Sequence, residues 1–450
     1  MIKIYNTLTR QKEEFKPIKE GEVGIYSCGP TVYNYVHIGN LRSYLFADLL
    51  HRAFFYNGYK VKHIMNITDV DDKTIRDSQK EGLKLTEFTK KYTEAFFEDL
   101  DKLNINRSEY IFPRATENID GMVELIKKLL EKGIAYKAED GSIYFDISKF
   151  PNYGKLSGVD FERDSKSRIS NDEYAKDEAH DFALWKAWDE KDGDVFWETE
   201  LGKGRPGWHI ECSVMSSKNI ANHFDIHTGG IDLVFPHHEN EIAQSEAAND
   251  EKFVNYWMHN EMLMVDNQKM SKSLDNVYKL NDILNKGYSS LDFRYLILFT
   301  HYRQKLNFTW ESLGAAKNGL LNLKNKIISF GIEKGNVDNN YKERFLDAIN
   351  DDLNTPQALA VLQEVLKSDL SNPDKLATIL DFDKVLGLKL DEVGSGETEI
   401  PQDITALAEQ RKKAKAEKNF ALSDEIRDKI IDRGFVIEDL AGGEYKLVKK

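Results

Sequence analysis

The sequence predicts an α/β fold in which a parallel sheet carries a long insertion and is followed by a mainly helical C-terminal region. Two observations lead to this prediction. A strand, a helix and a second strand follow one another within residues 22–67, and sheet-forming patterns resume only near residue 207. The segment between the two, 135–204, is rich in charges and turns. With 450 residues, the chain is long enough for two to four domains.

The first half of the sheet begins with a βαβ unit. Glu22–Cys28 has the composition of a strand and ends at a Gly-Pro turn, after which apolar residues recur at helical spacing. Gly58 stands where that helix would end, and Val61–Ile67 is predicted to be the second strand. Such a unit places its strands in parallel, in a Rossmann-like sheet. Ligands of these sheets bind beyond the carboxyl ends of the strands, where Cys28 and Thr68 lie.

The second half of the sheet is expected to resume after the insertion. Phe224–Phe235 contains a further strand pattern, and Pro236 after it marks a helix start. We therefore divide this part of the chain into a first half of the sheet domain at 1–134, an insertion at 135–204 and a second half at 205–275.

The remainder of the chain is mostly helical by pattern as far as about Leu390. Val393–Glu397 has the composition of a flexible linker. The expected segments are a connecting region at 276–340, a helical bundle at 341–392 and a small module at 401–450.

Composition narrows the class of protein. The net charge of −14 argues against a broadly basic nucleic-acid-binding surface, although a basic strip can exist on an acidic protein. Two cysteines in 450 residues argue against a disulfide framework and fit a reducing compartment. The sequence has no run of about 18 apolar residues and no apolar signal-peptide core at its N-terminus. We expect a cytoplasmic protein without membrane contact.

Two short runs are suited to anions. His37-Ile38-Gly39-Asn40 opens a predicted helix, where free N–H groups and the helix dipole favour phosphate. Lys269-Met270-Ser271-Lys272-Ser273 places two lysines three apart, a cationic loop suited to the phosphates of a nucleoside triphosphate. Each run alone has a simpler explanation. His37 could merely cap a helix beside a closely packed glycine, and the lysine run could be a solvated surface turn. Together they give the chain anion sites after its first strand and after its last.

The order and spacing of these runs resemble the HIGH and KMSKS signatures of class I aminoacyl-tRNA synthetases. Longer runs resemble one family among them, the cysteinyl-tRNA synthetases. They are Cys-Gly-Pro-Thr-Val-Tyr at 28–33, Arg-Pro-Gly-Trp-His-Ile-Glu-Cys-Ser at 205–213, His-Thr-Gly-Gly-Ile-Asp-Leu at 227–233, Phe-Pro-His-His-Glu-Asn-Glu at 235–241 and Asp-Asp-Leu-Asn-Thr-Pro at 351–356. The resemblance extends from the first strand to Leu440, essentially the whole chain.

This resemblance implies a cysteine–tRNA ligase. Such an enzyme activates L-cysteine with ATP to cysteinyl-adenylate and transfers the cysteinyl group to the 3′ end of tRNA(Cys). The resemblance also implies a monomer, a stem-contact region at 276–340, a DALR-like bundle at 341–392 and anticodon recognition at 401–450. In that module, Arg411-Lys412-Lys413-Ala414-Lys415 is the strongest local basic run, although a solvated helix face explains it equally well.

A metal site is chemically plausible but is not located by the residues alone. Cys28, Cys212, His237 and Glu241 offer two thiolates, an imidazole and a carboxylate, a tetrahedral zinc set. By spacing alone, His238 or Glu239 would serve as well. The resemblance selects the first set and implies one Zn²⁺ per chain, which binds the substrate thiol. Serine and cysteine have nearly the same shape, because they differ only in an oxygen atom in place of a sulfur atom. A metal that prefers thiolate to hydroxyl therefore distinguishes them better than the shape of a pocket does.

The resemblance assigns the remaining site residues one by one. It implies that Trp208 stacks beside the cysteine pocket; the alternative is a core tryptophan next to Cys212. It also implies that other pocket residues hold the amino acid or adenylate. It places Mg²⁺ with the ATP, although no carboxylate cluster identifies a protein ligand. The implied sets are Thr31, Asn66 and Thr68 for the amino acid, Gly230 and Asp232 for the adenosine, and His37, Asn40, Lys269 and Lys272 for the phosphates and catalysis.

Several positions carry no assignment or depart from the family pattern. Asn40 stands where the signature has a second histidine, and Asp275 stands where a glycine is common. His209 and His227 receive no role from the sequence.

Two other functions fit parts of the sequence. A cysteine ligase that acylates a small amino-sugar would share the catalytic fold, but residues 341–450 argue against it. An inactive RNA-binding homologue would not need the intact lysine run.

Overall fold

A computed structural model describes residues 1–158, 181–393, 402–417, 419–439 and 445–449. The contacts divide the chain into two compact units, Met1–Leu390 and Asp391–Lys450. The predicted linker at Val393–Glu397 lies almost wholly outside the described residues. None of the helices in the described ranges has the length and apolar character needed to cross a membrane.

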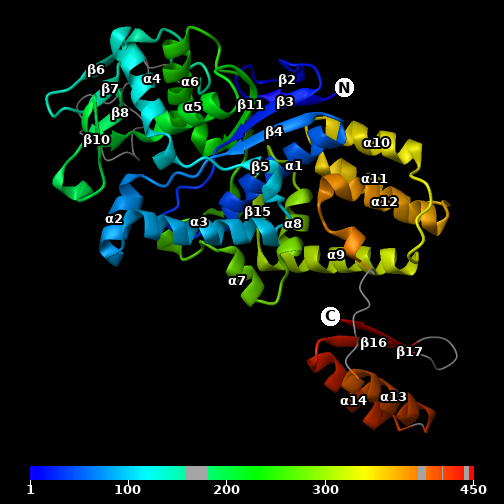
Figure 1. Ribbon diagram of the computed structural model, residues 1–450. Coiled ribbons are helices and arrows are strands. Elements are labelled where there is room, and N and C mark those ends of the chain that lie inside the picture. Colours follow the sequence, from blue (N-terminus) through cyan, green and yellow to red (C-terminus); the bar gives the residue numbers. More distant parts are fainter. Residues whose placement is uncertain (159–180, 394–401, 418, 440–444, 450) are drawn as a thin grey trace. The chain divides into compact units, whose positions relative to one another are not determined.

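The centre of the first unit is a parallel sheet in the strand order β12-β11-β3-β4-β5 (Figure 1). Every neighbouring pair in this sheet is parallel, which confirms the predicted α/β fold. Its strands are β3 (Glu22–Ser27), β4 (Lys60–Met65), β5 (Tyr110–Ile111), β11 (Phe224–Gly230) and β12 (Val254–Asn260). The strand β5 at the edge of the sheet has only two residues.

Helices connect and cover these strands. The helix after β3 begins at Ile38 and ends at Tyr56, and Gly58 follows it with a φ of +87°, as its composition predicts. The helices of the catalytic region are α1 (Ile38–Tyr56), α2 (Asp72–Glu81), α3 (Leu85–Lys102), α4 (Ile119–Glu131), α5 (Trp208–Asn219) and α6 (Glu239–Asn249). An antiparallel hairpin, β1 (Lys3–Asn6) and β2 (Gln11–Glu14), precedes the sheet.

The predicted helix start at Pro236 is confirmed, because Phe235 is the last residue with non-helical backbone angles before α6. Phe235 has φ −138° and ψ 134°, which interrupts the irregular turn Val234–His238, and the regular helix α6 begins at Glu239. The turn places His237 just before α6, one helical turn before Glu241 and on the same face.

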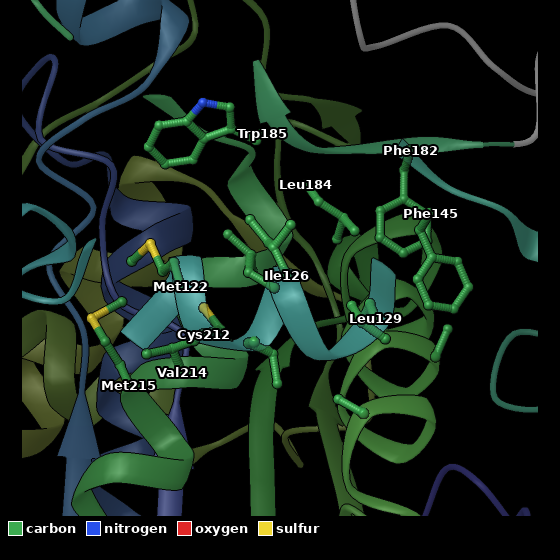
Figure 2. Packing of buried hydrophobic residues seen from close by; sticks show 14 of the residues in the cluster. Met122, Ile126, Leu129, Phe145, Phe182, Leu184, Trp185, Cys212, Val214 and Met215 are labelled. Atoms are coloured by element: carbon green, nitrogen blue, oxygen red, sulfur yellow. The ribbon is translucent and has the colours of Figure 1, made fainter. Parts of the chain in front are cut away.

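The insertion forms a second, antiparallel sheet in the order β6-β7-β8-β10-β9. Its strands are β6 (Ala135–Lys137), β7 (Ile143–Phe145), β8 (Phe182–Ala187), β9 (Trp197–Thr199) and β10 (Gly202–Pro206). Figure 2 shows Phe145, Phe182 and Leu184 of this sheet gathered with Ile126 and Leu129 of α4 in one buried cluster. Cys212 on α5 belongs to the same cluster, so the insertion helps to hold the segment that carries this thiol.

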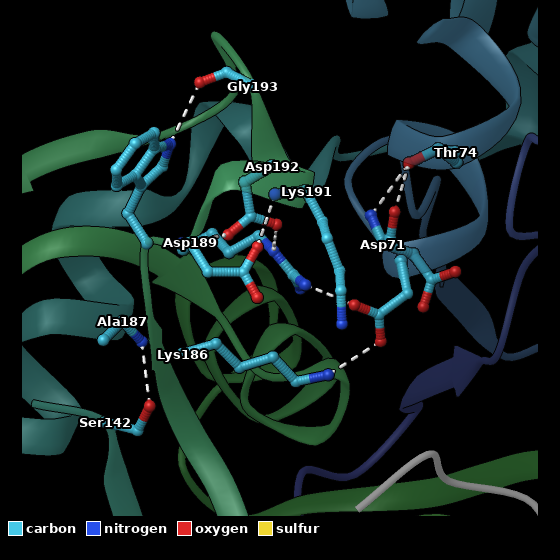
Figure 3. A network of polar contacts seen from close by, with 12 residues as sticks. Asp71, Thr74, Ser142, Lys186, Ala187, Asp189, Lys191, Asp192 and Gly193 are labelled. Carbon is cyan, nitrogen blue, oxygen red and sulfur yellow. Dashed lines mark hydrogen bonds and ion pairs between the residues drawn. The ribbon is translucent and has the colours of Figure 1, made fainter. Parts of the chain in front are cut away.

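Charged residues also attach the insertion to α2 (Figure 3). Lys186 Nζ lies 2.7 Å from Asp72 Oδ2, and the buried Arg205 pairs with both Asp72 and Asp192. The Arg205 Nε–Asp192 Oδ1 distance is 2.8 Å. The start of α2, which follows the carboxyl end of β4, is thereby fixed to the second sheet.

The rest of the first unit is mainly helical. A small sheet of order β14-β13-β15 comes first and carries the lysine run at one end. The elements are β13 (Leu263–Val265), β14 (Gln268–Lys269), α7 (Leu280–Asn285), α8 (Ser290–Leu298), β15 (Leu306–Phe308), α9 (Trp310–Ser329), α10 (Asn339–Asn350), α11 (Thr355–Lys367) and α12 (Asn372–Leu386).

The second unit has its own small core. It consists of α13 (Gln402–Ala416), α14 (Phe420–Asp432) and the antiparallel hairpin β16 (Phe435–Asp439) and β17 (Tyr445–Lys449). Ile404, Ile426 and Ile430 are among its buried residues.

Part of the basic run on α13 is engaged inside this second unit. Arg411 is buried and donates to Asp439 Oδ1 at 2.7 Å, and Lys415 Nζ lies 2.6 Å from Asp439 Oδ2. These two cations therefore stabilise the module, and less of the run faces solvent than its sequence indicates.

Candidate active site and metal centre

The chemically active residues meet at the carboxyl ends of the parallel strands. Cys28 follows β3, Asn66 and Thr68 follow β4, and Gly230 ends β11. Pairing of β3 with both neighbours aligns these ends. The sheet thus brings together residues separated by up to about 200 positions, at the edge where such sheets bind ligands.

Four side chains form a compact cluster at this edge. One ligand-type atom from each of Cys28, Cys212, His237 and Glu241 lies within 4.8 Å of the others. The Cys212 Sγ–His237 Nε2 distance is 3.5 Å, and His237 Nε2 lies 3.0 Å from Glu241 Oε1. Glu241 Oε1 nevertheless has no hydrogen bond of good geometry. An imidazole nitrogen and a carboxylate oxygen in this arrangement, beside two thiols, fit a shared metal ion.

The electrostatics of the cluster also favour a cation. Burial opposes ionisation of Glu241, but the neighbouring His227 and His237 outweigh it and lower the pKa of the carboxyl to about 2. Burial also opposes ionisation of Cys212, yet the Cys28 hydrogen bond and the charge of His237 lower the pKa of that thiol to about 6. Burial raises the pKa of Cys28. The cluster thus already holds one thiolate and one carboxylate near neutral pH.

A second set of four residues overlaps the first. Cys28, His227, His238 and Glu241 also come within 4.8 Å of one another. However, His227 Nε2 is already bonded to Glu241 Oε2 at 2.9 Å. Because the first set contains both thiols, which zinc prefers, it is the better ligand set. His227 is then a supporting residue that orients Glu241 through its second oxygen.

His209 supports His237, the nitrogen ligand of the preferred set. Its Nδ1 lies 2.9 Å from Nδ1 of His237, opposite the nitrogen that faces Cys212. Ligand histidines in proteins commonly bond a partner through their second nitrogen. Sequence analysis gave His209 and His227 no role, and no spacing in the sequence marks them, since the contacts depend on the packing of α5 and β11 against α6.

Trp208 lies beside the cluster. Its ring stacks on the His237 ring at a centroid distance of 4.1 Å and an angle of 28°, and it is only partly buried. A core tryptophan would be fully enclosed, so the geometry favours an aromatic wall beside the cluster.

The polar residues after β4 form a chain of hydrogen bonds. Asn66 Oδ1 accepts from the Gly29 N–H at 2.8 Å, and Asn66 Nδ2 donates to Thr68 Oγ1 at 3.1 Å. Thr68 in turn donates to Glu211 Oε2 at 2.8 Å. A Cβ on Gly29 would lie 1.8 Å from the Asn66 backbone oxygen, so only glycine allows this approach. Thr31 pairs with Thr68 as an isolated bridge, so it lies beside this chain of hydrogen bonds.

The start of α1 has an unusual cap. His37 Nδ1 accepts the Asn40 N–H at 3.2 Å, while Asn40 Oδ1 accepts the His37 N–H at 3.2 Å. Burial lowers the pKa of His37, so its ring is neutral near pH 7 and leaves Nε2 for a ligand. The Asn40 amide nitrogen remains a possible donor, as expected for the residue that replaces the second histidine.

The lysine run lies against this helix start. Ile38 N–H donates to the Tyr278 carbonyl at 2.9 Å, and His37 pairs with Lys279 as an isolated bridge. A Cβ on Gly39 would meet the Met270 methyl group at 2.4 Å. A larger residue at this position would displace the Met270 side chain, so Gly39 favours close contact between the two signature runs.

Within the run itself, Lys269 is exposed on β14, and the side chain of Lys272 lies outside the part of the chain that the structure describes. The Ser271 N–H donates to Asn276 Oδ1 at 2.8 Å. Asp275 has a φ of +48°, the left-handed conformation that favours glycine. The conformation explains why glycine suits this position.

Gly230 and Asp232 border the same side of the site. Asp232 is exposed in a short helical turn after β11, and its charge acts on His37. The structure therefore brings the predicted adenosine residues to the predicted phosphate residues.

Comparison with known proteins gives the family. A family model described as the class I (C) tRNA synthetase catalytic domain matches residues 14–318, and a DALR domain model matches 344–368. A cysteine–tRNA ligase of Protochlamydia amoebophila is 47% identical over 98% of this chain and 97% of its own length. The chain belongs to the cysteine–tRNA ligase family. The relative from Methanosarcina acetivorans is 46% identical, with 98% of each chain covered.

Solved structures support the fold of this synthetase family member. Methionyl-tRNA synthetase of Mycobacterium tuberculosis, in complex with methionyl-adenylate, aligns with a TM-score of 0.58. The alignment covers 82% of this chain and 90% of that one at 13% identity, so it shows a common class I synthetase fold. Together with the cluster of possible ligands, the family is consistent with a bound metal.

Proposed function

We propose that this chain is an ATP-dependent ligase that charges tRNA(Cys) with L-cysteine in two steps. In the first, the cysteine carboxylate attacks the α-phosphorus of ATP, which gives cysteinyl-adenylate and pyrophosphate. In the second, a hydroxyl of the 3′-terminal adenosine takes the cysteinyl group and AMP leaves. Positioning and electrostatic stabilisation supply the acceleration, because neither step needs a protein nucleophile. Cysteine–tRNA ligases at 46–47% identity over nearly the whole chain carry this proposal.

Selection of cysteine would take place at the buried cluster. Cys28, Cys212, His237 and Glu241 would hold one Zn²⁺, whose preference for thiolate over hydroxyl supplies the discrimination against serine. Trp208 would form the wall beside the substrate sulfur, and Thr31, Asn66 and Thr68 would orient the amino acid. Support comes from the hydrogen-bonded chain of Asn66 and Thr68 close to Cys28.

ATP would bind where the two signature runs meet. His37 and Asn40 at the start of α1 would hold the phosphates, with help from the helix dipole. Lys269 and Lys272 would neutralise charge that develops on the leaving pyrophosphate, with Mg²⁺ bound to the nucleotide. Gly230 and Asp232 would contact the adenosine, where a carboxylate suits ribose hydroxyls.

The remaining regions would bind tRNA(Cys). In this proposal 1–134 and 205–275 form the catalytic domain, 135–204 the insertion, 276–340 the stem-contact region and 341–392 the helical bundle, and the module at 401–450 reads the anticodon. The DALR family match at 344–368 supports the bundle. We further propose a monomer, as the family resemblance implies, and a cytoplasmic location, since both cysteines are free thiols suited to a reducing compartment.

The direct test is cysteine-dependent exchange of pyrophosphate into ATP. The proposal predicts exchange with cysteine, little with serine, and loss of exchange after removal of zinc by a chelator. Absence of exchange with cysteine would contradict it. Acylation of an amino-sugar in place of tRNA(Cys) would favour the alternative ligase.

A further inference from the structure

The turn between α10 and α11 contains Asp-Asp-Leu-Asn-Thr-Pro at 351–356, a run that neither the metal cluster nor the ATP site explains. Asp352 is 0% exposed, although carboxylates are rarely buried without partners. Asp352 and Leu353 have φ of 64° and 56°, in the left-handed region that disfavours residues other than glycine. A buried charge in an unfavourable backbone conformation needs specific contacts to hold it there.

The Asp352 carboxylate binds two distant segments at once. Oδ1 accepts the Tyr5 N–H of β1 at 2.8 Å and the Tyr302 hydroxyl at 2.6 Å. Oδ2 accepts Arg303 Nε at 2.7 Å, and Arg303 Nη2 lies 2.6 Å from the same oxygen. Backbone contacts add to these, because the Asp352 N–H donates to the Lys3 carbonyl at 2.8 Å.

The segment 301–304 is held from its other side by α1. Arg42, which is 1% exposed, donates from Nη1 to the Met262 carbonyl at 2.7 Å. Its Nη2 contacts the carbonyls of Tyr302 and Gln304. The Phe46 ring, also on α1, stacks on Tyr302 at a centroid distance of 4.4 Å. A continuous series of polar and aromatic contacts therefore joins the 351–356 turn to α1 of the catalytic domain, at Arg42 and Phe46.

The metal cluster and the amino-acid pocket lie outside this series. Their residues come from the ends of β3, β4 and β11 and from α5 and α6. Within the ranges that the structure describes, no hydrogen bond or ion pair of Asp352 reaches those elements. Loss of the Asp352 contacts would thus loosen the helical region from the catalytic domain without altering the ligands of cysteine.

We propose that Asp352 is a positioning residue for the transfer step. It fixes α10–α12 on the catalytic domain, so that tRNA bound along the helical region delivers its 3′ end to the adenylate. This inference rests on the proposed ligase function. Because a displacement of about 1 Å can reduce a rate about a hundredfold, a single anchor of this kind can govern transfer.

The neighbouring carboxylate offers a matched control. Asp351 lies in the same turn, but its side chain is 52% exposed and pairs with Lys12 Nζ at 2.7 Å. Exposed ion pairs contribute little to the stability of a fold. Asp352→Asn and Asp351→Asn therefore remove the same charge from adjacent residues, one buried and one exposed.

The experiment compares two rates for each full-length variant, tRNA-independent pyrophosphate exchange and cysteinylation of a tRNA(Cys) transcript. For Asp352→Asn we expect kcat/KM for tRNA to fall at least about tenfold while exchange stays within about twofold. For Asp351→Asn we expect both to stay within about twofold.

Equal losses of exchange and cysteinylation, or no loss in Asp352→Asn, would overturn the inference. If Asp352→Asn fails to fold, Tyr302→Phe removes one donor to the same carboxylate, and a smaller loss confined to cysteinylation is expected. Failure of the ligase function itself is distinguishable, because the unaltered chain would then lack cysteine-dependent exchange.

Discussion

The metal cluster and the lysine run differ in how firmly the fold holds them. Cys212, His237 and Glu241 are all at most 2% exposed, and further histidines fix the second atoms of His237 and Glu241. Lys269 is exposed on a two-residue strand, and Asp275 beside it has an unfavourable backbone conformation. Under the proposed function, the residues that recognise the substrate sulfur lie in the rigid core, whereas the lysines for ATP activation lie on a loop that adapts to its ligand.

The largest effect is expected from loss of a cluster ligand. Cys212→Ser replaces a thiolate with a poor zinc ligand in a buried site. We expect bound zinc to fall well below one per chain and cysteine-dependent exchange to fall at least about a hundredfold. Changes in residues that only support the ligands already reduce metal affinity or activity about ten- to a hundredfold. Metal content and exchange are measured together. Full metal content with unchanged exchange would show that the cluster is not the recognition site.

Zinc affinity should depend strongly on pH. Burial opposes protonation of His237, but Glu241 and Cys212 outweigh it and raise the pKa of the ring to about 10. Burial also raises the pKa of Cys28. Both protons must leave when zinc binds, so affinity should rise about a hundredfold per pH unit between about pH 7 and 8. Competition with a chromophoric chelator measures this, and a pH-independent affinity would contradict the ligand assignment.

The supporting histidines should have a smaller effect. His227→Asn removes the contact to Glu241 Oε2 and should weaken zinc binding about ten- to a hundredfold. His223→Asn is the control, because His223 pairs with Asn255, away from the cluster. An equal loss in both variants would mean that His227 acts only through general stability.

The lysine run should affect rate more than binding of cysteine. Lys269→Met should lower kcat for exchange about tenfold and leave KM for cysteine unchanged, because the exposed cation stabilises only the charge on the leaving pyrophosphate. Lys305→Met, an exposed lysine next to β15 of the same small sheet, is the control. A raised KM for cysteine in Lys269→Met would contradict the proposal that the lysine run and the metal cluster have separate roles.

The smallest effect is expected at Asp275. Glycine relieves the left-handed strain of about 1 kcal/mol but costs about 0.5–1 kcal/mol in chain entropy. Asp275→Gly should therefore change the free energy of unfolding by less than about 1 kcal/mol and leave exchange intact. Asp275→Val, which is branched at Cβ, should destabilise the chain more, and thermal unfolding of both variants checks the order.

The two regions also differ in how far the sequence predicts them. The βαβ unit and the cap at His37 follow from spacing and from Gly58, because those signals are local. The supporting roles of His209 and His227 could not be predicted, since they depend on α5, β11 and α6 packing together. Arg411 looked like a basic surface residue, but its partner Asp439 lies on a strand 28 positions away. Asp352 is similar, because its partners Tyr5 and Tyr302 lie 347 and 50 positions away.

The most direct test of the central claim uses Co²⁺ in place of Zn²⁺ in the full chain. Thiolate bound to Co²⁺ gives a ligand-to-metal charge-transfer band, so each additional metal-bound sulfur increases the absorption. If the cluster at Cys28, Cys212, His237 and Glu241 binds the substrate sulfur, cysteine should strengthen and shift this band, and serine at the same concentration should not. An unchanged band at saturating cysteine, or the same change with serine, would contradict the account.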